Sequence, residues 1–289
     1  MTYHAWYALY IDLYKRDLKP RTREEYDRLH RAHIAPILGA CELSAITPED
    51  VQRVLVAAAD RSGQRTAQAV HALIRAVMRR AVRSRLLTWS PCDAIDRPQH
   101  SPASGVAMTE ADYAASLPWI LDDLALSLAL LAGLRRGEIC GLQWGDVDLP
   151  ARVLHIRRTR QRVGGELLTQ PPKSAAGVRD VPIAPVLLPL LRSAYRLTPG
   201  AWVIPTAPEA LDRRWRRIQS RVVSLSQPYR LHDLRHTYVT RLLLAGTLPR
   251  VVQYVAGHSS LDMTMRVYAH VTPADACREL GKTYNNGQF

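Results

Sequence analysis

Hydrophobic positions in the first third of the chain recur every three to four residues, the spacing of a helix that packs one face against a core. Residues 3–17 show this pattern and predict a first helix. Its apolar and aromatic positions are Trp6, Leu9, Tyr10, Leu13 and Tyr14. A second helix is expected from Pro20, which suits a first helical position, to Pro36 and Gly39, which end it.

Two further helices are predicted before residue 90. Thr47 precedes a proline and two acidic residues, a typical capped helix start. Residues 64–87 form an amphipathic pattern. Its apolar positions are Val70, Leu73, Ile74, Val77, Met78 and Val82. Its opposite face carries Arg75, Arg79, Arg80, Arg83 and Arg85. Arg75, Arg79 and Arg83 are therefore candidate contacts to a polyanion, with a merely solvated basic face as the alternative.

The pattern changes in the middle of the chain. Residues 88–107 are rich in proline and polar residues, which is typical of a linker. A helix near Thr109 and a strongly apolar helix at about 119–133 follow. Short β-type runs at 153–157, 166–169 and 179–183 then predict a small antiparallel sheet. Helices resume at about 185.

These patterns predict a mainly α protein. We expect a four-helix N-terminal domain at residues 1–90, a linker at 91–107, and an α+β domain with a small antiparallel sheet at 108–289. A chain of 289 residues with 47% hydrophobic residues is long and apolar enough for two such cores.

Charge and cysteine usage narrow the function. The formal net charge of +13 points to a polyanionic partner, most commonly nucleic acid. The four cysteines are scattered, without a C-x-x-C pair or a cluster with histidine, which argues against a zinc site and a disulfide framework. The N-terminus is no signal peptide, and no apolar run reaches the roughly 18 residues of a membrane span. We therefore expect a cytoplasmic protein.

Several polar residues in the second half are candidates for chemistry, although each alone has an ordinary structural explanation. Arg135 lies at the junction of two predicted helices, and Lys173 on a turn between two predicted strands. His232 and Arg235 share one face of a helix through their i, i+3 spacing. His236 adds an i, i+4 histidine pair, but no third ligand is evident, so we predict no metal site.

Two more candidates follow. His258 comes after Gly257 at the predicted start of another helix, where the helix N-terminus favours anions. Tyr268 lies ten positions later, near a helix end, where a tyrosine most often serves a core or an interface.

Together these side chains suit phosphoryl transfer. Arginine forks and histidine donors can stabilise the charge that accumulates on a phosphodiester under attack. A phenol, with a pKa of about 10, becomes a competent nucleophile when nearby cations favour its anion or a base removes its proton. A lysine can protonate the departing 5′-oxygen. No acidic metal cage is evident, so the sequence predicts no metal and no cofactor.

The order Arg, Lys, His-x-x-Arg, His, Tyr resembles the tyrosine recombinase (phage integrase) family. The resemblance rests on Ala-Gly-Leu-Arg-Arg-Gly-Glu-Ile-Cys-Gly-Leu-Gln-Trp at 132–144, His-Asp-Leu-Arg-His-Thr at 232–237, Gly-His-Ser-Ser at 257–260 and Tyr-Ala-His at 268–270. It covers residues 109–271. The N-terminal helices resemble the family's SAM-like core-binding domain more loosely.

The resemblance implies a role for each residue of the reaction. Arg135 and Arg235 would clamp the scissile phosphate. Tyr268 would attack it and form a 3′-phosphotyrosine link, and Lys173 would protonate the 5′-oxygen.

It also implies supporting roles. His232 would act as acid and base near the tyrosine, and His258 would hold a non-bridging oxygen. Glu138 and Asp233 would orient their neighbours.

The resemblance further implies a site-specific recombinase that integrates or excises phage or mobile-element DNA. Its partners would be double-stranded DNA with core-type sites, a homotetramer joined through the tail at 272–289, and a directionality factor, on the nucleoid of a bacterial host. The predicted core-binding helices begin almost at Met1, as in a minimal two-domain member without an arm-binding domain. That departure weakens the case for arm sites and a directionality factor, and leaves a chromosome-dimer-resolving type open.

Three other functions are compatible with parts of the pattern. A type IB topoisomerase-like enzyme would relax any supercoiled plasmid without paired sites. A DNA-binding protein of this fold would lack catalysis. A metal-dependent nuclease would lose cleavage in EDTA, whereas the tyrosine mechanism predicts that cleavage persists.

Overall fold

The computed structural model describes residues 1–99, 105–197 and 200–265. Tyr268 and the tail at 272–289 lie outside these residues. Contacts between Cα atoms divide the chain into two compact units, residues 1–104 and 105–289, each described here by itself. The predicted bounds 1–90, 91–107 and 108–289 stay a prediction.

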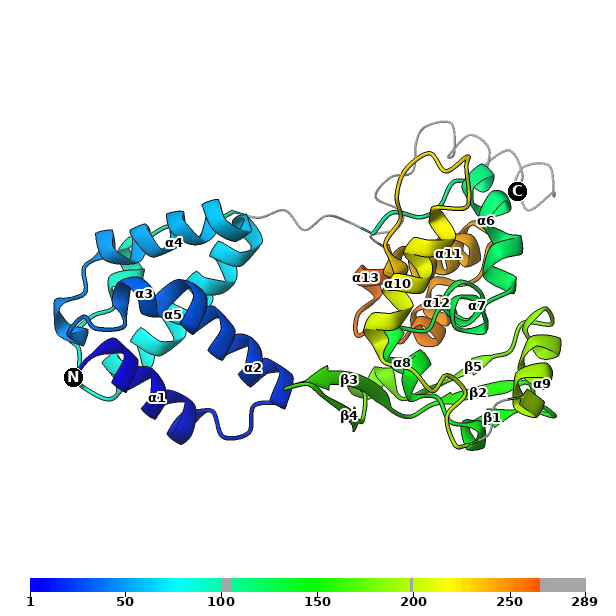
Figure 1. The fold of residues 1–289 in the computed structure, drawn as a ribbon. Helices are drawn as coiled ribbons and strands as arrows, with labels where there is room; N and C mark the ends of the chain where they lie inside the picture. The colour runs from blue at the N-terminus through cyan, green and yellow to red at the C-terminus, as the bar shows by residue number, and fades with distance from the viewer. Residues whose placement is uncertain (100–104, 198–199, 266–289) are drawn as a thin grey trace, which may run out of the picture. The chain divides into compact units, whose positions relative to one another are not determined.

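The first unit is helical throughout its described residues (Figure 1). Its helices are α1 (Tyr3–Tyr14), α2 (Pro20–Leu29), α3 (Ala35–Leu38), α4 (Pro48–Ser62) and α5 (Gln64–Arg83), with a π-helical turn at His30–Ile34 and 3₁₀ turns at Leu43–Ala45 and Pro91–Ala94. The apolar face predicted for α5 lies in the core, where Leu73, Ile74 and Met78 are almost fully buried. Trp6 of α1 is tied to α5, since its Nε1 donates to the Val77 carbonyl over 3.0 Å.

The second predicted helix is continuous over residues 20–38, with a π-helical turn between α2 and α3. Proline at position 36 has no N–H to donate to the carbonyl of Ala32, four residues earlier. In the structure this carbonyl accepts a hydrogen bond from Arg61 Nη1 of α4 over 3.1 Å instead. The helix passes through the π-helical turn, and the freed carbonyl joins it to α4.

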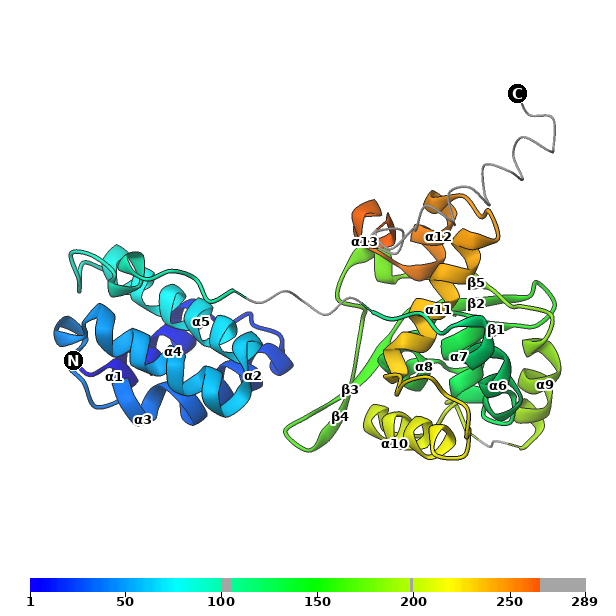
Figure 2. The same ribbon diagram turned by 90° about the horizontal axis from the view of Figure 1, so that it is seen from above.

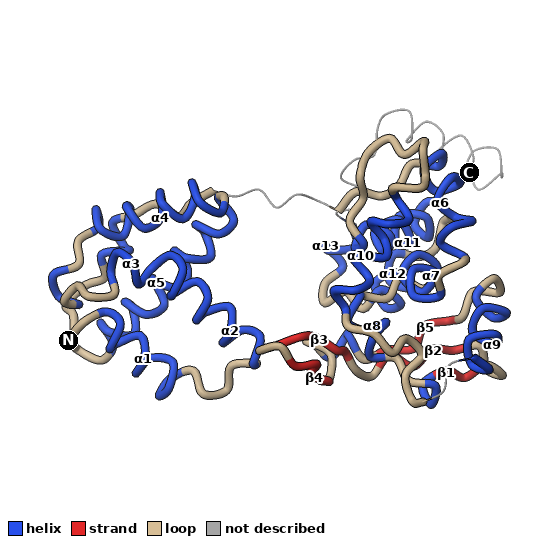
Figure 3. The backbone as a smooth tube through the Cα atoms, viewed as in Figure 1, coloured by secondary structure: helices blue, strands red, loops and turns tan. Residues whose placement is uncertain are grey.

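The second unit combines helices with two small antiparallel sheets (Figures 2 and 3). Its helices are α6 (Glu110–Leu121), α7 (Leu124–Leu131), α8 (Arg136–Gly141), α9 (Leu187–Leu197), α10 (Pro208–Gln219), α11 (Leu231–Leu244), α12 (Pro249–Ala256) and α13 (Leu261–Met265), with 3₁₀ turns at Trp144–Asp146 and Ala175–Gly177. Strands β1 (Val147–Asp148), β2 (Val153–Ile156) and β5 (Arg179–Pro182) form one sheet in the order β1-β2-β5. Strands β3 (Thr159–Val163) and β4 (Glu166–Gln170) form a separate hairpin.

Two details differ from the sequence prediction. The apolar helix expected at 119–133 is broken, because Asp123 Oδ1 accepts the N–H groups of Ala125 (3.0 Å) and Leu126 (3.3 Å) and so caps a new helix, α7. Strand β3 was not expected, because its sequence Thr-Arg-Gln-Arg-Val has few apolar residues. It pairs with β4 in the hairpin and packs against α8, although none of its residues is fully buried.

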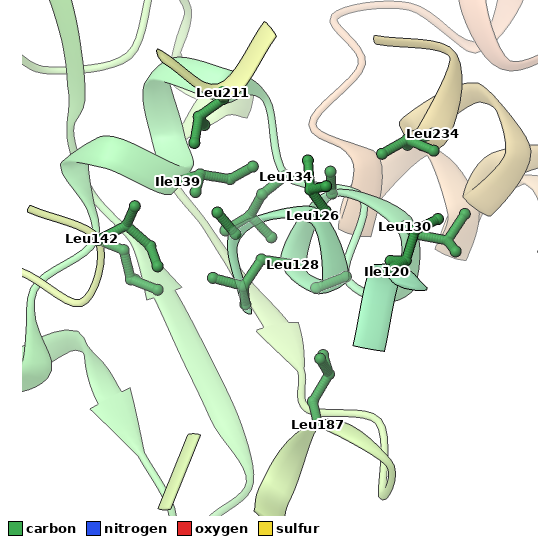
Figure 4. Packing of buried hydrophobic residues seen from close by; sticks show 14 of the residues in the cluster. Ile120, Leu126, Leu128, Leu130, Leu134, Ile139, Leu142, Leu187, Leu211 and Leu234 are labelled. Carbon is green, nitrogen blue, oxygen red and sulfur yellow. The ribbon is translucent and has the colours of Figure 1, made fainter. Parts of the chain in front are cut away.

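The apolar helix α7 lies at the centre of the second unit. It contacts α6, α8, α9, α10 and α11. Its side chains Leu126, Leu128 and Leu130 are buried among residues from these elements (Figure 4). The end of α7, the start of α8 and the first turns of α11 are thereby fixed to one core. No helix among the described residues has the length and apolar character needed to cross a membrane.

Candidate active site

Three arginines converge on the C-terminal end of α12. Arg179 Nε donates to the carbonyl of residue 255 over 2.7 Å, Arg235 Nη2 donates to that of residue 256, and Arg135 Nη2 donates to that of residue 257 over 2.8 Å. The last carbonyls of a helix lack intrahelical partners and lie at the negative end of the helix dipole. The helix end therefore stabilises three neighbouring positive charges, here named the arginine cluster.

Gly257 makes this helix end possible. Its φ of +62° and ψ of +47° lie in the left-handed region that favours glycine. A Cβ at this position would lie 2.8 Å from the carbonyl oxygen of Ala176 and 3.0 Å from Arg179 Cδ. Glycine is therefore required by both backbone conformation and space.

Glu138 is the counter-charge of the cluster. Only 3% exposed, it accepts hydrogen bonds from the Arg135 backbone N–H (2.9 Å) and Arg135 Nη1 (2.7 Å). Arg179 Nη1 and Nη2 donate to its two carboxylate oxygens over 3.1 and 3.0 Å. The carboxylate thus joins α8 to β5 and satisfies two arginines at once.

Electrostatics in the cluster follow from burial and proximity. Burial raises the pKa of Glu138, but hydrogen bonds and charge from Arg179, with the charges of Arg135 and Arg235, outweigh it and lower that pKa to about 2. Burial and the charge of Arg135 lower the pKa of Arg235 to about 9. With this lowered pKa the Arg235 guanidinium is still charged at neutral pH. Because the positive charges repel one another, the cluster is suited to bind an anion.

Arg135 is positioned by a second glycine. Gly133 follows α7 with a φ of +64°, and a Cβ there would lie 2.3 Å from the ring of Tyr238. The Gly133 carbonyl accepts a hydrogen bond from Arg235 Nη1 over 2.5 Å. Arg235 is buried, whereas Arg135 retains 34% side-chain exposure. Arg135 pairs with Glu138 and also reaches the end of α12.

His232 and Asp233 occupy the first turn of α11. Asp233 is buried and caps the helix by accepting the Arg230 backbone N–H over 2.7 Å; it also accepts the N–H of Val106 over 3.3 Å. The His232 ring is exposed and meets the His236 ring edge to face, with centroids 4.8 Å apart. Partial loss of hydration and the charges of neighbouring His236 and Arg235 lower the pKa of His232 to about 4. The imidazole is therefore neutral at physiological pH and can accept a proton.

His258 follows the end of α12 and is half-buried. Its Nδ1 lies 2.9 Å from Thr264 Oγ1 of α13. Burial and the charges of Arg235 and Arg135 lower its pKa to about 3. The sequence placed His258 at a helix start; it is instead held by the C-terminal end of α12, three residues before α13 begins.

The remaining candidates are not joined to the cluster by described contacts. Lys173 is exposed in the loop between β4 and β5, and its side chain makes no hydrogen bond or ion pair within the described residues. The nucleophile candidate, Tyr268, lies outside those residues. The structure thus brings together Arg135, Arg235 and His258, with His232 one turn from Arg235.

Arg179 is a site residue that sequence reasoning missed. Its side chain is fully buried, with 0% exposure. The signal lay in strand alternation, because Arg179 and Val181 share the inward face of β5. An arginine on the inward face of a strand needs a buried acidic partner, which here is Glu138.

The α5 arginines lie in the first unit. Arg79 and Arg83 are exposed and Arg75 is partly exposed. Among the described residues, the ion-pair contacts of Arg75 and Arg79 are long, 3.9 and 4.0 Å, both with Asp93. Their guanidinium groups remain accessible to an anion. Within the described residues, no group of three or more His, Cys, Asp or Glu side chains could hold a metal ion.

The fold is a helical scaffold with two small antiparallel sheets, and it gathers Arg135, Arg179 and Arg235 at the end of one helix. The chain belongs to the phage integrase family, whose model matches residues 108–275. A second model, the N-terminal SAM-like domain of phage integrases, matches residues 2–56.

Relatives and solved structures agree with this family. The chain is 29% identical to a Mycobacterium tuberculosis protein named as the prophage phiRv2 integrase, over 89% of this chain and 72% of that protein. It is 28% identical to the tyrosine recombinase XerC of Mesorhizobium japonicum, over 90% and 88%. A DNA-bound Tn1549 transposon integrase has the same fold, with a TM-score of 0.83, 23% identity, and coverage of 98% of this chain and 99% of that one.

These findings confirm the predicted family, the mainly α fold with a small antiparallel component, and the activity class. The chain is a site-specific tyrosine recombinase, a class of enzyme that cleaves and rejoins DNA. The role of each residue stays a prediction.

Proposed function

We propose that this chain cuts and rejoins double-stranded DNA at core-type sites, with Tyr268 as the nucleophile and the arginine cluster as the phosphate clamp. The observation that carries the proposal is the convergence of Arg135, Arg179 and Arg235 on the end of α12, directly before His258. Tyr268 follows His258 by ten residues in the sequence. The carbonyls that hold the clamp, at residues 255–257, thus lie shortly before the nucleophile in the sequence.

The chemistry is a transesterification at phosphorus. The Tyr268 oxygen forms a bond to the scissile phosphorus while the bond to the 5′-oxygen breaks. The phenol proton passes to His232, whose lowered pKa keeps the imidazole neutral and able to accept it. Lys173 gives a proton to the departing 5′-oxygen. In the reverse direction a 5′-hydroxyl attacks the phosphotyrosine, so the phosphoester bond is conserved without ATP.

The clamp acts through charge held in place before the substrate arrives. Arg135, partly exposed, presents donors that its bonds to Glu138 and Gly257 leave unused. Arg235 adds positive charge behind it. Donors that are already fixed toward the developing charge need no reorganisation during the reaction, which is the largest advantage that such a site provides.

Further parts of the proposal concern partners. The α5 arginines Arg75, Arg79 and Arg83 contact the DNA backbone, and the tail at 272–289 joins neighbouring copies in a homotetramer. Support comes from lambda integrase, solved as a tetramer bound to a Holliday junction, whose fold is similar with a TM-score of 0.69, 19% identity, and coverage of 90% of this chain and 78% of that one. The enzyme would integrate or excise mobile DNA on the bacterial nucleoid in the cytoplasm, with a directionality factor as a candidate partner.

The test traps the covalent intermediate. Nicked DNA carrying a candidate site should give a denaturation-resistant protein–DNA adduct with the unaltered chain, in EDTA as well as in magnesium. Tyr268→Phe should abolish the adduct while DNA binding persists, whereas Tyr195→Phe, a change at an exposed tyrosine of α9, should not. An adduct with Tyr268→Phe would show that another residue is the nucleophile.

The role of Lys173 has its own test. Lys173→Ala should bind DNA but cleave it slowly, because the 5′-oxygen departs without a proton. A substrate with sulfur in place of the bridging 5′-oxygen needs no proton to depart, and should restore cleavage. Failure of this rescue would remove Lys173 as the acid.

A further inference from the structure

Hydrogen bonds hold both the main chain and the ring of His258 in place. Its backbone N–H donates to the Gln253 carbonyl over 3.1 Å, and its own carbonyl accepts from Gln253 Nε2 over 3.2 Å. These bonds fix the main chain of His258. The ring itself is held at one nitrogen, Nδ1, which lies 2.9 Å from the Thr264 hydroxyl.

The direction of this ring contact follows from a count of donors and acceptors. Thr264 has 0% exposure, so its hydroxyl proton needs a partner inside the protein. Within the described residues, His258 Nδ1 is the only hydrogen-bond partner of this hydroxyl. The hydroxyl therefore donates and Nδ1 accepts. If Nδ1 carried the proton instead, the buried hydroxyl proton would have no acceptor there.

The charges around His258 determine how many protons the ring carries. Burial and the positive charges of Arg235 and Arg135 lower the pKa of His258 to about 3, so the ring is neutral at pH 7. A neutral imidazole has a single N–H, and the contact at one ring nitrogen decides which nitrogen holds it. With Nδ1 accepting, the proton lies on Nε2, which has no hydrogen bond within the described residues.

We propose that Thr264 is a positioning residue, which fixes His258 in the Nε2–H tautomer so that this nitrogen donates to a non-bridging oxygen of the scissile phosphate. The inference rests on the proposed function and deepens it. With the opposite tautomer, a lone pair would face the phosphate oxygens and repel them. Thr264 belongs to α13, four residues before Tyr268, so one short segment sets the donor and carries the nucleophile.

The tautomer can be measured directly in the full-length protein. Histidine labelled with ¹⁵N distinguishes a protonated ring nitrogen from an unprotonated one by chemical shift, and His258→Gln identifies the His258 signals among the ten histidines. We expect Nε2–H at pH 7 in the unaltered chain and in Thr264→Ser, which keeps the hydroxyl. Thr264→Val keeps the shape without the hydroxyl, and should give a mixture of tautomers. Ser259→Ala, an exposed hydroxyl in the same segment, serves as the matched control and should leave the tautomer unchanged.

Single-turnover cleavage of nicked DNA gives the second readout. Thr264→Val should lower the cleavage rate at saturating DNA by about 10-fold to 100-fold, the range found when a metal-ligating histidine loses the hydrogen-bond partner that orients it. Its DNA affinity should stay within about 2-fold, and Thr264→Ser should restore the rate. A purely structural role for the threonine would not link the rate to the tautomer in this way.

Two results would overturn the inference. One is an Nδ1–H tautomer in the unaltered chain, a measurement that needs no variant to fold. The other is a Thr264→Val protein whose tautomer or cleavage rate matches that of the unaltered chain. Absence of any covalent adduct with the unaltered chain would instead refute the proposed function, while the NMR result would still decide whether Thr264 sets the tautomer.

Discussion

Replacing Glu138 with glutamine tests whether one buried carboxylate holds the arginine cluster together. Glutamine has nearly the same shape, but it carries no charge and turns one acceptor oxygen into a donor. In the structure that carboxylate accepts four hydrogen bonds from Arg135 and Arg179. The variant would leave the buried Arg179 guanidinium facing an amide N–H₂, with no counter-charge.

The size of the effect can be estimated in two ways. Removing one partner of a buried ion pair costs about 3–5 kcal/mol of folding free energy. Independently, the pKa of Glu138 falls from its ordinary value of 4.5 to about 2, and that difference corresponds to about 3 kcal/mol. For a unit of this size, about 3 kcal/mol lowers the melting temperature by roughly 6–12 °C.

The pH dependence has a definite sign. The pKa of Glu138 is lower in the folded state than in the unfolded state, so its stabilisation is fully present above about pH 4.5. It is lost as the pH falls from there toward 2. The difference in unfolding free energy between the unaltered chain and Glu138→Gln should therefore be constant near neutrality and shrink in acid.

Scanning calorimetry of the full chain at several pH values measures both effects. Glu110→Gln is the matched control, because Glu110 is 78% exposed and its ion pair with Arg241 lies at the surface. Such pairs contribute about 1 kcal/mol or less. If Glu138→Gln melted within about 2 °C of the control at pH 7, the buried carboxylate would not stabilise the cluster and the reasoning would fail.

Two other predictions concern the backbone of the clamp and the basic face of α5. Gly257→Ala should destabilise the second unit and lower the cleavage rate at least 10-fold, because a Cβ would meet a carbonyl oxygen at 2.8 Å in a left-handed conformation; an unchanged rate would contradict this role. Arg79→Ala and Arg83→Ala should each reduce the slope of log affinity against log salt by about 1, as expected for one lost phosphate contact. Arg53→Ala is the control, because Arg53 is an exposed arginine of α4 paired with a neighbouring acid, and it should leave the slope unchanged. An equal effect from all three variants would show that the α5 arginines have no specific role in DNA binding.

The sequence predicted the parts of the fold that depend on local chemistry. Thr47 caps α4 as expected, with its hydroxyl accepting the Asp50 N–H over 3.2 Å, and the apolar face of α5 is buried. Asp123 was missed as a helix cap because apolar residues on both sides of it were taken as one helix, although aspartate favours the N-cap position. The strand β3 was missed because it is stabilised by pairing with β4 and packing against α8, and a polar sequence displays neither.

The candidate site shows the same division. Motif order pointed to Arg135, Arg235 and His258, and hydrogen bonds tie both arginines to the helix end that immediately precedes His258. Neither the inward arginine, Arg179, nor the supporting hydroxyl of Thr264 carries a motif of its own. Their positions follow from β5 and α13 packing beside α12, a tertiary arrangement that residue spacing alone does not specify.

The end of α12 has a consequence for how such a site tolerates sequence change. Its three acceptors are main-chain carbonyls, at residues 255–257, and every amino acid provides a carbonyl. Substitutions at Val255 and Ala256 that keep the helix in place leave the anchoring atoms intact. At Gly257 the left-handed backbone and the nearby Ala176 carbonyl require glycine. The anchor of the arginine cluster is thus formed by main-chain atoms, which side-chain substitutions do not remove.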